Sequence, residues 1–326
     1  MRHPDQLSGG RKEHPIVIVT AGDAGYALPM TVALHSALTA LDQTRAVKVF
    51  VIGHEIDPGH QARATAALRG AHPHVEVGWL RADQSSFSGL PTSHWHSPAM
   101  YLRLLIPSLL PAEFERVLYI DGDVVVSRDL SPLWSLGMNG HPVMAVENFS
   151  DPTLDAAIPG LVSALGLDGA APYFNSGVML IDVPLWRELS IVERTLEVLG
   201  RHPDKISFGD QDALNAAIAG DWGALDPSYN VQLHTVADFG HRRWSPRERR
   251  RQQRALLSAP TILHYTGPRK PWQVRYRGRK AGGFLAAAAR SGWFGGLGQA
   301  WGFGLGAGQM AFRAAAAMAA TLPVGT

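Results

Sequence analysis

The chain contains 326 residues, enough for one large α/β domain with an appendage or for two domains. Apolar residues make up 46% and charged residues 18% of the sequence, so neither global disorder nor a coiled coil describes it. Cysteine is absent, which excludes disulfides, thiolate metal sites and thiol nucleophiles together.

The net charge of +2 hides an asymmetry along the chain. Residues 1–241 contain 15 Lys/Arg and 27 Asp/Glu, whereas residues 242–326 contain 15 Lys/Arg and one Asp/Glu. An acidic body with a basic C-terminal quarter indicates contact with an anionic partner. Residues 1–14 lack the apolar stretch of a signal peptide, which predicts a disordered N-terminal extension on a cytoplasmic protein.

Buried β-branched runs alternate with helical patterns over most of the chain. The runs predict strands at Pro15–Thr20, Val47–Gly53, Val75–Leu80, Val117–Ile120, Pro142–Val146 and Thr261–Gly267, and another strand after Asn175-Ser176-Gly177. Helices are predicted at Tyr26–Leu41, from the cap Asp57 to Gly70, and at Pro98–Ile106, Pro184–Leu199 and Asp210–Ile218. This order predicts an α/β fold with a mainly parallel sheet and ligands at the carboxyl ends of its strands.

Asp121-Gly122-Asp123 directly follows the buried run Val117–Ile120. Two carboxylates on a tight turn at a sheet edge offer the oxygen ligands that Mg²⁺ and Mn²⁺ prefer. The alternative is an ordinary polar turn, but burial right up to the carboxylates favours the metal site. Asp23, after the first strand, is expected to converge on the same cleft.

Other polar residues are weaker candidates, because each also has an ordinary structural explanation. His264, one of 14 histidines, could join the two aspartates at a metal or be a loop residue. Asp210 and Gln211 open a helix, where acidic residues are common, and Asn175 could belong to a turn. Without a P-loop or a Gly-x-Gly-x-x-Gly motif, phosphate would be held by metal and side chains; without a Gly-x-Ser-x-Gly elbow, a serine hydrolase is not expected.

Five segments, in order, resemble glycosyltransferase family 8 over about residues 15–275: IVTAGDAGYA, the apolar strand with DGD, FNSGVMLID, DQDALN and HYTGPRKPW. That family contains bacterial lipopolysaccharide galactosyl- and glucosyltransferases and glycogenin-like enzymes. The resemblance implies a GT-A fold with a Rossmann-like sheet, a UDP-sugar donor, Mn²⁺ or Mg²⁺, and transfer with retention of anomeric configuration.

Matched position by position, the resemblance also implies roles for individual residues. The metal would be held by Asp121, Asp123 and His264, with Gly122 between the two aspartates, and the metal would hold the diphosphate. Gly267 and Lys270 would contact the phosphates. Ala21 and Asp23 would meet the uracil, and Tyr101 and Arg103 would reach the nucleotide-sugar. Asn175 would hold the donor sugar or shape the acceptor side, and Asp210 and Gln211 would lie at the donor sugar near the reacting carbon.

Two departures from the family pattern bear on specificity. Ala24 and Gly25 stand where the family often has a second Asp and an Asn, and Glu147 stands where galactosyl enzymes often have Asp. Galactose specificity is therefore not carried over. For the mechanism, double displacement through Asp210 competes with front-face attack by the acceptor assisted by Gln211, and the second is preferred.

The basic C-terminal quarter contains two clusters, Arg242–Arg254 and Arg269–Lys280, followed by an uncharged run with Trp and Phe. We therefore expect residues 15–280 to form the transferase domain and residues 281–326 an Ala/Gly/aromatic-rich segment on an anionic membrane surface. A membrane span, or a solvated basic face with a low-complexity tail, are the alternatives. No motif accompanies the arginines that would indicate nucleic-acid binding.

The sequence thus predicts a hexosyltransferase that moves glucose or galactose from a UDP-sugar to a glycan or glycolipid acceptor at the inner face of the cell membrane. Two other functions stay open within this resemblance: a soluble transferase for a polyol or protein acceptor, and a nucleotide-sugar-binding protein without turnover. A metal-dependent nucleotidyltransferase or phosphohydrolase is a third class.

Overall fold

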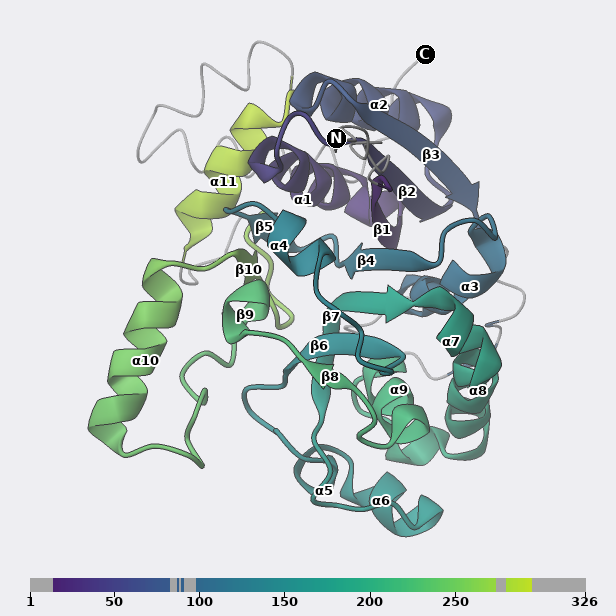
Figure 1. Cartoon of the computed structure of the whole chain (residues 1–326), viewed down its shortest axis with the longest axis vertical. Coiled ribbons are helices and arrows are strands. Elements are labelled where there is room, and N and C mark those ends of the chain that lie inside the picture. Colours follow the sequence, from purple (N-terminus) through teal and green to yellow (C-terminus); the bar gives the residue numbers. More distant parts are fainter. Residues whose placement is uncertain (1–13, 83–86, 88, 91–97, 274–279, 295–326) are drawn as a thin grey trace, which may run out of the picture.

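A seven-stranded sheet forms the centre of the computed structural model, which describes residues 14–82, 87, 89, 90, 98–273 and 280–294 (Figure 1). Its strand order is β3-β2-β1-β4-β7-β6-β8. The bounds are β1 Ile16–Asp23, β2 Val47–His54, β3 Val75–Arg81, β4 Arg116–Ile120, β6 Val143–Glu147, β7 Phe174–Asp182 and β8 Gly223–Ala224. Only β7 runs antiparallel to its neighbours, so the predicted mainly parallel α/β sheet is confirmed.

A smaller sheet lies beside it, in the order β5-β10-β9. It consists of β5 Val124–Val126, β9 Val231–Gln232 and β10 Ile262–His264. β10 pairs antiparallel with β5 and parallel with β9. The two sheets meet at Asp121-Gly122-Asp123, because this turn connects β4 of the large sheet to β5 of the small sheet.

Helices cover both faces of the large sheet (Figure 1). Alternation along β1 sets the two cores: Ile16 and Ile18 face one cluster, and Val17 and Val19 face the other. The first core includes α1 Ala27–Ala40, α2 Pro58–Ala71 and α11 Ala281–Arg290, and the second includes η3 Pro98–Leu105, α3 Ile106–Leu109, α7 Val183–Glu188, α8 Ile191–Arg201 and α9 Asp210–Ile218. The remaining helices are η1 Ala24–Tyr26, α4 Ser131–Trp134, α5 Leu154–Ala157, α6 Pro159–Leu165, η4 Pro203–Lys205, η5 Pro227–Asn230 and α10 Pro246–Ser258.

The structure corrects several predicted elements. The helix predicted at Pro184–Leu199 is two helices, α7 and α8, because Ser190 has a left-handed backbone with φ of 50°. Asn175-Ser176-Gly177 does not precede a strand but lies within β7, beside a register shift in its pairing with β6. β1 continues to Asp23. The arginine-rich run after Ser245 forms α10, which the sequence analysis missed.

The segment after Lys280 packs against the first core. α11 buries Phe284 and Leu285 there. Trp293 is 2% exposed and stacks on His60 of α2, with ring centroids 5.6 Å apart. The predicted N-terminal extension and most of the uncharged C-terminal run lie outside the described residues. Among the helices of the described ranges, none has the length and hydropathy needed to cross a bilayer.

Candidate active site

Three potential metal ligands converge where the two sheets meet. Asp121, Asp123 and His264 offer ligand atoms that all lie within 4.8 Å of one another. His264 Nε2 is 3.2 Å from Asp123 Oδ1 and 3.8 Å from Asp121 Oδ2. Asp123 and His264 are buried, and Asp121 is half-buried. The predicted cluster is therefore present, on the β4–β5 turn and at the end of β10.

Hydrogen bonds orient His264 for ligation. Gly177 N donates to Asn175 Oδ1 (3.1 Å), and Asn230 Nδ2 donates to the same oxygen (2.8 Å). Asn230 Oδ1 therefore faces His264 Nδ1 at 2.9 Å and accepts its proton. The lone pair on Nε2 then points toward the two carboxylates, as a hard divalent cation requires of a histidine ligand. This donor set fits Mn²⁺ or Mg²⁺.

The backbone of β7 passes directly beside the cluster. A Cβ atom at position 177 would lie 2.2 Å from His264 Cε1 and 2.8 Å from Asp121 Oδ2, so glycine is required there. Gly177 O also accepts a hydrogen bond from Asp121 N (2.8 Å). Gly122 is similarly confined, because its Cβ would lie 2.7 Å from Met30 Cγ.

Arg103, from η3, links the cluster to α9. Its guanidinium lies 3.0 Å from Asp121 Oδ1 and 2.9 Å from Asp210 Oδ2, and it donates to Ser176 O (2.9 Å). Burial acts to lower the pKa of Arg103, but Asp121 and Asp210 raise it overall, so the cation is retained. Tyr101, on the same η3 turn, is buried, and burial with the nearby Asp210 raises its pKa to about 12.

Asp210 is fully enclosed at the first position of α9. Arg103 Nε lies 2.9 Å from Asp210 Oδ2 as an ion pair but directs its N–H to Met100 O, so Oδ2 accepts no hydrogen bond among the described residues. Burial raises the pKa of Asp210 to about 7, with Arg103 opposing and Asp121 adding to the shift. A buried carboxylate oxygen that is ion-paired but accepts no hydrogen bond is suited to accept one from a ligand hydroxyl.

A chain of hydrogen bonds fixes Gln211. Its Oε1 accepts from Ser176 N (3.1 Å) and from Asn175 Nδ2 (3.0 Å). Its Nε2 donates to Tyr173 OH (2.9 Å), whose own proton goes to Asp212 Oδ1 at 2.5 Å. The backbone donor at Ser176 sets the direction of the whole chain, so the carbonyl of Gln211 is already occupied by two donors.

Lys270 adds a positive charge to the cluster beside Asp123. Its Nζ is 2.5 Å from Asp123 Oδ2 and donates to Tyr265 O (3.0 Å). Burial acts to raise the pKa of Asp123, but Lys270 and His264 hold it well below its ordinary value. Gly267 has φ of 88° and packs on His234 in the turn between His264 and Lys270.

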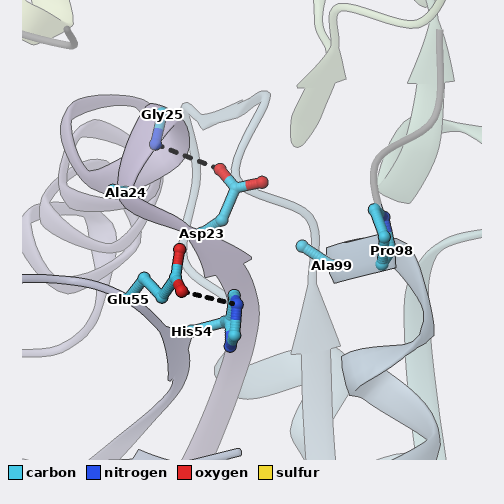
Figure 2. A pocket seen from close by; sticks show the side chains of 7 residues that line it. All are labelled: Asp23, Ala24, Gly25, His54, Glu55, Pro98 and Ala99. Carbon is cyan, nitrogen blue, oxygen red and sulfur yellow. Dashed lines mark hydrogen bonds and ion pairs between the residues drawn. The ribbon is translucent and has the colours of Figure 1, made fainter. Parts of the chain in front are cut away.

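The carboxyl ends of β1 and β2 form a separate cavity of 370 Å³ (Figure 2). Its lining residues are Asp23, Ala24, Gly25, His54, Glu55, Pro98 and Ala99. In Figure 2, Asp23 accepts a hydrogen bond from Gly25 N, and Pro98 and Ala99 lie across the cavity. Ala21 is two residues before Asp23 in β1 and is not among the lining residues. The sequence-predicted residues thus form two groups, joined by η3, which provides both Ala99 and Arg103.

Glu147 is at the end of β6, opposite Phe174 of β7 and so one residue from Asn175. Its side chain forms an ion pair with Arg243. Burial raises the pKa of Glu147, and Arg243 lowers it in part. Arg243 thus connects the basic region to the edge of the site.

Several residues that shape the candidate site were not predicted from the sequence. They include Asn230, Gly177, Tyr173, Asp212 and Tyr119. Gly177 and Asp212 stand inside segments that the resemblance singled out, so position in a motif was an available signal. Asn230 lies in the short helix η5, where no sequence pattern distinguishes it.

Comparison with known proteins finds a family pattern and several related proteins. The pattern of the family described as "Glycosyl transferase family 8" matches residues 17–275. General stress protein A of Bacillus subtilis is 33% identical over 267 residues, covering 80% of this chain and 89% of that protein. The lipopolysaccharide 1,2-glucosyltransferase of Escherichia coli is 31% identical over 198 residues, covering 61% of this chain and 56% of that protein.

A crystal structure of the galactosyltransferase LgtC in complex with donor and acceptor sugar analogues has the same fold. It aligns with a TM-score of 0.71 and 26% identity, covering 84% of this chain and 95% of LgtC. Because the family pattern spans most of the chain and the architecture is the same, this protein belongs to glycosyl transferase family 8, with the GT-A fold.

Proposed function

We propose that this protein is a retaining hexosyltransferase that moves glucose or galactose from a UDP-sugar to a glycan or glycolipid acceptor. The observation that carries the proposal is the cluster of Asp121, Asp123 and His264, with His264 oriented through Nδ1 by Asn230. Family membership and relatives named as lipopolysaccharide glycosyltransferases support the reaction class.

The proposed donor site extends from this cluster to the cavity at Asp23. Asp121, Asp123 and His264 would hold Mn²⁺ or Mg²⁺, which supplies positive charge against the developing charge of the UDP leaving group. Gly267 and Lys270 would flank the diphosphate, and Ala21 and Asp23 would meet the base. Asp210 Oδ2, which pairs with Arg103 but accepts no hydrogen bond, would accept one from a hydroxyl of the donor sugar, with Tyr101 nearby.

The surroundings of Asp210 and Gln211 support front-face attack. Asp210, the nucleophile that double displacement would need, is buried and ion-paired with Arg103, which reduces its nucleophilicity. Since Gln211 Oε1 already accepts two hydrogen bonds, it is not available as a nucleophile without rearrangement. In the proposed step the acceptor oxygen bonds to the anomeric carbon as the bond to UDP breaks on the same face. The acceptor proton passes to the leaving phosphate oxygen, while Lys270 and Arg103 supply fixed positive charge. Asn175 and Gln211 would shape the space for the sugar.

A donor screen tests the proposal. Purified protein with Mn²⁺ is incubated with individual nucleotide-sugars, and the released nucleotide is identified. Slow release of UDP from one UDP-hexose, abolished in Asp123→Asn, is expected. Release of UMP or free phosphate would indicate the nucleotidyltransferase or phosphohydrolase class instead. Metal-dependent UDP binding without turnover, even with glycan acceptors, would indicate a binding protein.

The location of the enzyme is part of the same proposal. It would act in the cytoplasm, with residues 15–280 as the transferase domain and, beyond the packed helix α11 and Trp293, the rest of residues 281–326 in contact with the anionic inner face of the membrane. The basic cluster Arg269–Lys280 and the aromatic residues that follow support this. Flotation of the full chain with phosphatidylglycerol vesicles, but not with phosphatidylcholine vesicles, is the expected result.

A further inference from the structure

One face of α10 is a continuous arginine surface. Arg247, Arg250, Arg251 and Arg254 recur at the spacing of a single helical face, and all four are exposed. The side chains of this face border a shallow open groove on the helix itself, lined by Arg247, Arg250, Arg251, Arg254, Ala255 and Ser258. The surface is therefore cationic and open to a ligand.

The charge of this surface is largely uncompensated. Glu248 is the one acidic residue after Asp238 in the sequence, and it pairs with Arg251 at 2.9 Å. Within the described ranges, Arg247, Arg250 and Arg254 have no carboxylate within 4.0 Å. Like charges at this spacing repel one another. A bound anion would relieve this repulsion and would be stabilised by attraction to several arginines at once.

The position of α10 relates the surface to the active site. The helix belongs to an excursion that leaves from β9 and returns into β10, and these two strands pair with each other next to His264 (Figure 1). Arg243, just before α10, contacts Glu147 beside the site. Thirteen residues of helix extend over about 20 Å. The helix ends at Ser258, and the chain reaches Ile262, the first residue of the strand that carries His264, a few residues later, so a ligand lying along α10 is on the same side of the chain's path into the site.

The composition of α10 favours a soluble anionic chain over a bilayer as the ligand of its arginine face. A helix that lies in a membrane interface exposes Trp, Phe or Leu beside its basic residues. Here Leu256 and Leu257 pack against the protein core instead, and Ala255 and Ser258 are the other residues of the arginine face. That face also lacks the aromatic side chains on which nucleic-acid bases stack.

We propose that the arginine face of α10 binds phosphate groups carried by the acceptor, so that the acceptor is a phosphate-bearing glycan chain. This inference rests on the proposed function, because it assigns the substrate class of the same site. Arginine suits phosphate, since its planar donors bind two oxygens at once. Binding along α10 would hold the acceptor while its terminal hydroxyl enters the site.

Linear inorganic polyphosphate serves as the probe. Its affinity is measured by calorimetry for the wild type and for a variant in which Arg247, Arg250, Arg251 and Arg254 are all replaced by Gln. The matched control replaces four exposed arginines on other elements, Arg69, Arg128, Arg194 and Arg201, by Gln, which changes the net charge equally. We expect at least tenfold weaker binding for the α10 variant and a much smaller change for the control.

Two further measurements keep the outcomes distinct. Metal-dependent UDP binding by the wild type tests the proposed function alone, and thermal unfolding of the α10 variant shows whether it is folded. Equal polyphosphate affinity in the wild type and the folded α10 variant, or equal losses in both variants, would overturn the inference. Vesicle flotation that needs the four arginines and resists competition by polyphosphate would make the bilayer the occupant, and would overturn it too.

Discussion

At the scale of single residues, Asn230 has the simplest role to test. It lies outside the cluster but accepts the Nδ1 proton of His264, which leaves Nε2 for the metal. Asn230→Ala removes that acceptor, so the ring loses its fixed tautomer and orientation. We expect Mn²⁺ affinity, measured by calorimetry with UDP present, to fall by about 10- to 100-fold. An unchanged affinity in a folded Asn230→Ala variant would contradict this role.

The raised pKa of Asp210 predicts how the stability of the protein depends on pH. Its pKa is raised from 3.8 to about 7 mainly by burial, so the folded protein keeps a proton that the unfolded chain has lost. The contribution of Asp210 to the free energy of unfolding therefore falls as pH rises between about 4 and about 7. Asp210→Asn removes this dependence, because its amide does not titrate.

The expected result is that the free energy of unfolding of Asp210→Asn rises relative to that of the wild type as the pH increases. The difference in free energy of unfolding, Asp210→Asn minus wild type, should increase by about 1 kcal/mol per pH unit between pH 4.5 and 6.5 and level off above pH 7. Urea unfolding of both proteins without added metal or donor measures this difference. A difference that is constant over this range would show that Asp210 has an ordinary pKa in the folded protein.

At the scale of elements, β7 organises the site more than any other strand. Its residues Asn175, Ser176 and Gly177 contact Gln211 on α9, Arg103 on η3 and the metal cluster. Two backbone N–H groups, at 176 and 177, set the direction of hydrogen bonds that run from Asp212 to His264. A small shift of this strand would therefore change both the metal ligands and the sugar side.

Gly177→Ala tests this close approach. The added methyl group would overlap His264 Cε1, and neither β7 nor β10 is free to retreat because both are buried. We expect loss of metal-dependent UDP binding and a lower unfolding midpoint. Gly200→Ala in α8 is the matched control: no neighbour lies within 4 Å of the new Cβ, so stability should rise by about 0.5–1 kcal/mol. Equal UDP binding in the wild type and Gly177→Ala would refute the argument.

Much of this arrangement was predictable from the sequence, for physical reasons. Buried apolar runs define β1, β2 and β4, and Asp57 begins α2 by capping Gly59 N and His60 N, as its place before Pro58 predicts. The aspartates and His264 stood at strand ends and met as expected. What could not be predicted depends on tertiary contacts: the antiparallel direction of β7, the break at Ser190, and the role of Asn230.

α10 was missed for a related reason. Its sequence, PRERRRQQRALLS, has few apolar residues, and none of its residues is fully buried. A search for an apolar stripe therefore finds little there, although Ser245 caps the helix through Glu248 N and Gln253 donates to Ala237 O. Capping and good helix-forming residues, rather than hydrophobic periodicity, were the available signals.

At the scale of the whole molecule, the C-terminal part of the described chain completes the core. Phe284 lies 5.1 Å from Trp272 and 5.8 Å from Tyr265 between ring centroids, and Trp293 stacks on His60. Relative to a chain that ends at Phe294, a chain that ends at Lys280 should lose several kcal/mol per large side chain removed and fail to fold stably. Thermal unfolding of the two shortened proteins measures this.

Similar unfolding midpoints for the two shortened proteins would mean that α11 adds little to stability. The expected difference also decides how membrane binding must be tested. Vesicle flotation should be compared between the full chain and the chain ending at Phe294, because that end point leaves α11 and Trp293 in place. A flotation loss after truncation at Lys280 could come from unfolding alone.

The excursion between β9 and β10 departs and returns at neighbouring points, since Val231 pairs with Leu263. Closing a longer or shorter loop between fixed ends changes the free energy only slowly with length. Insertions and replacements in such a segment leave the rest of the fold intact where the core contacts of Leu233, Val236 and Phe239 are kept. Related enzymes could therefore differ in this segment, and so in the acceptors they bind, while the potential metal ligands Asp121, Asp123 and His264 stay unaltered.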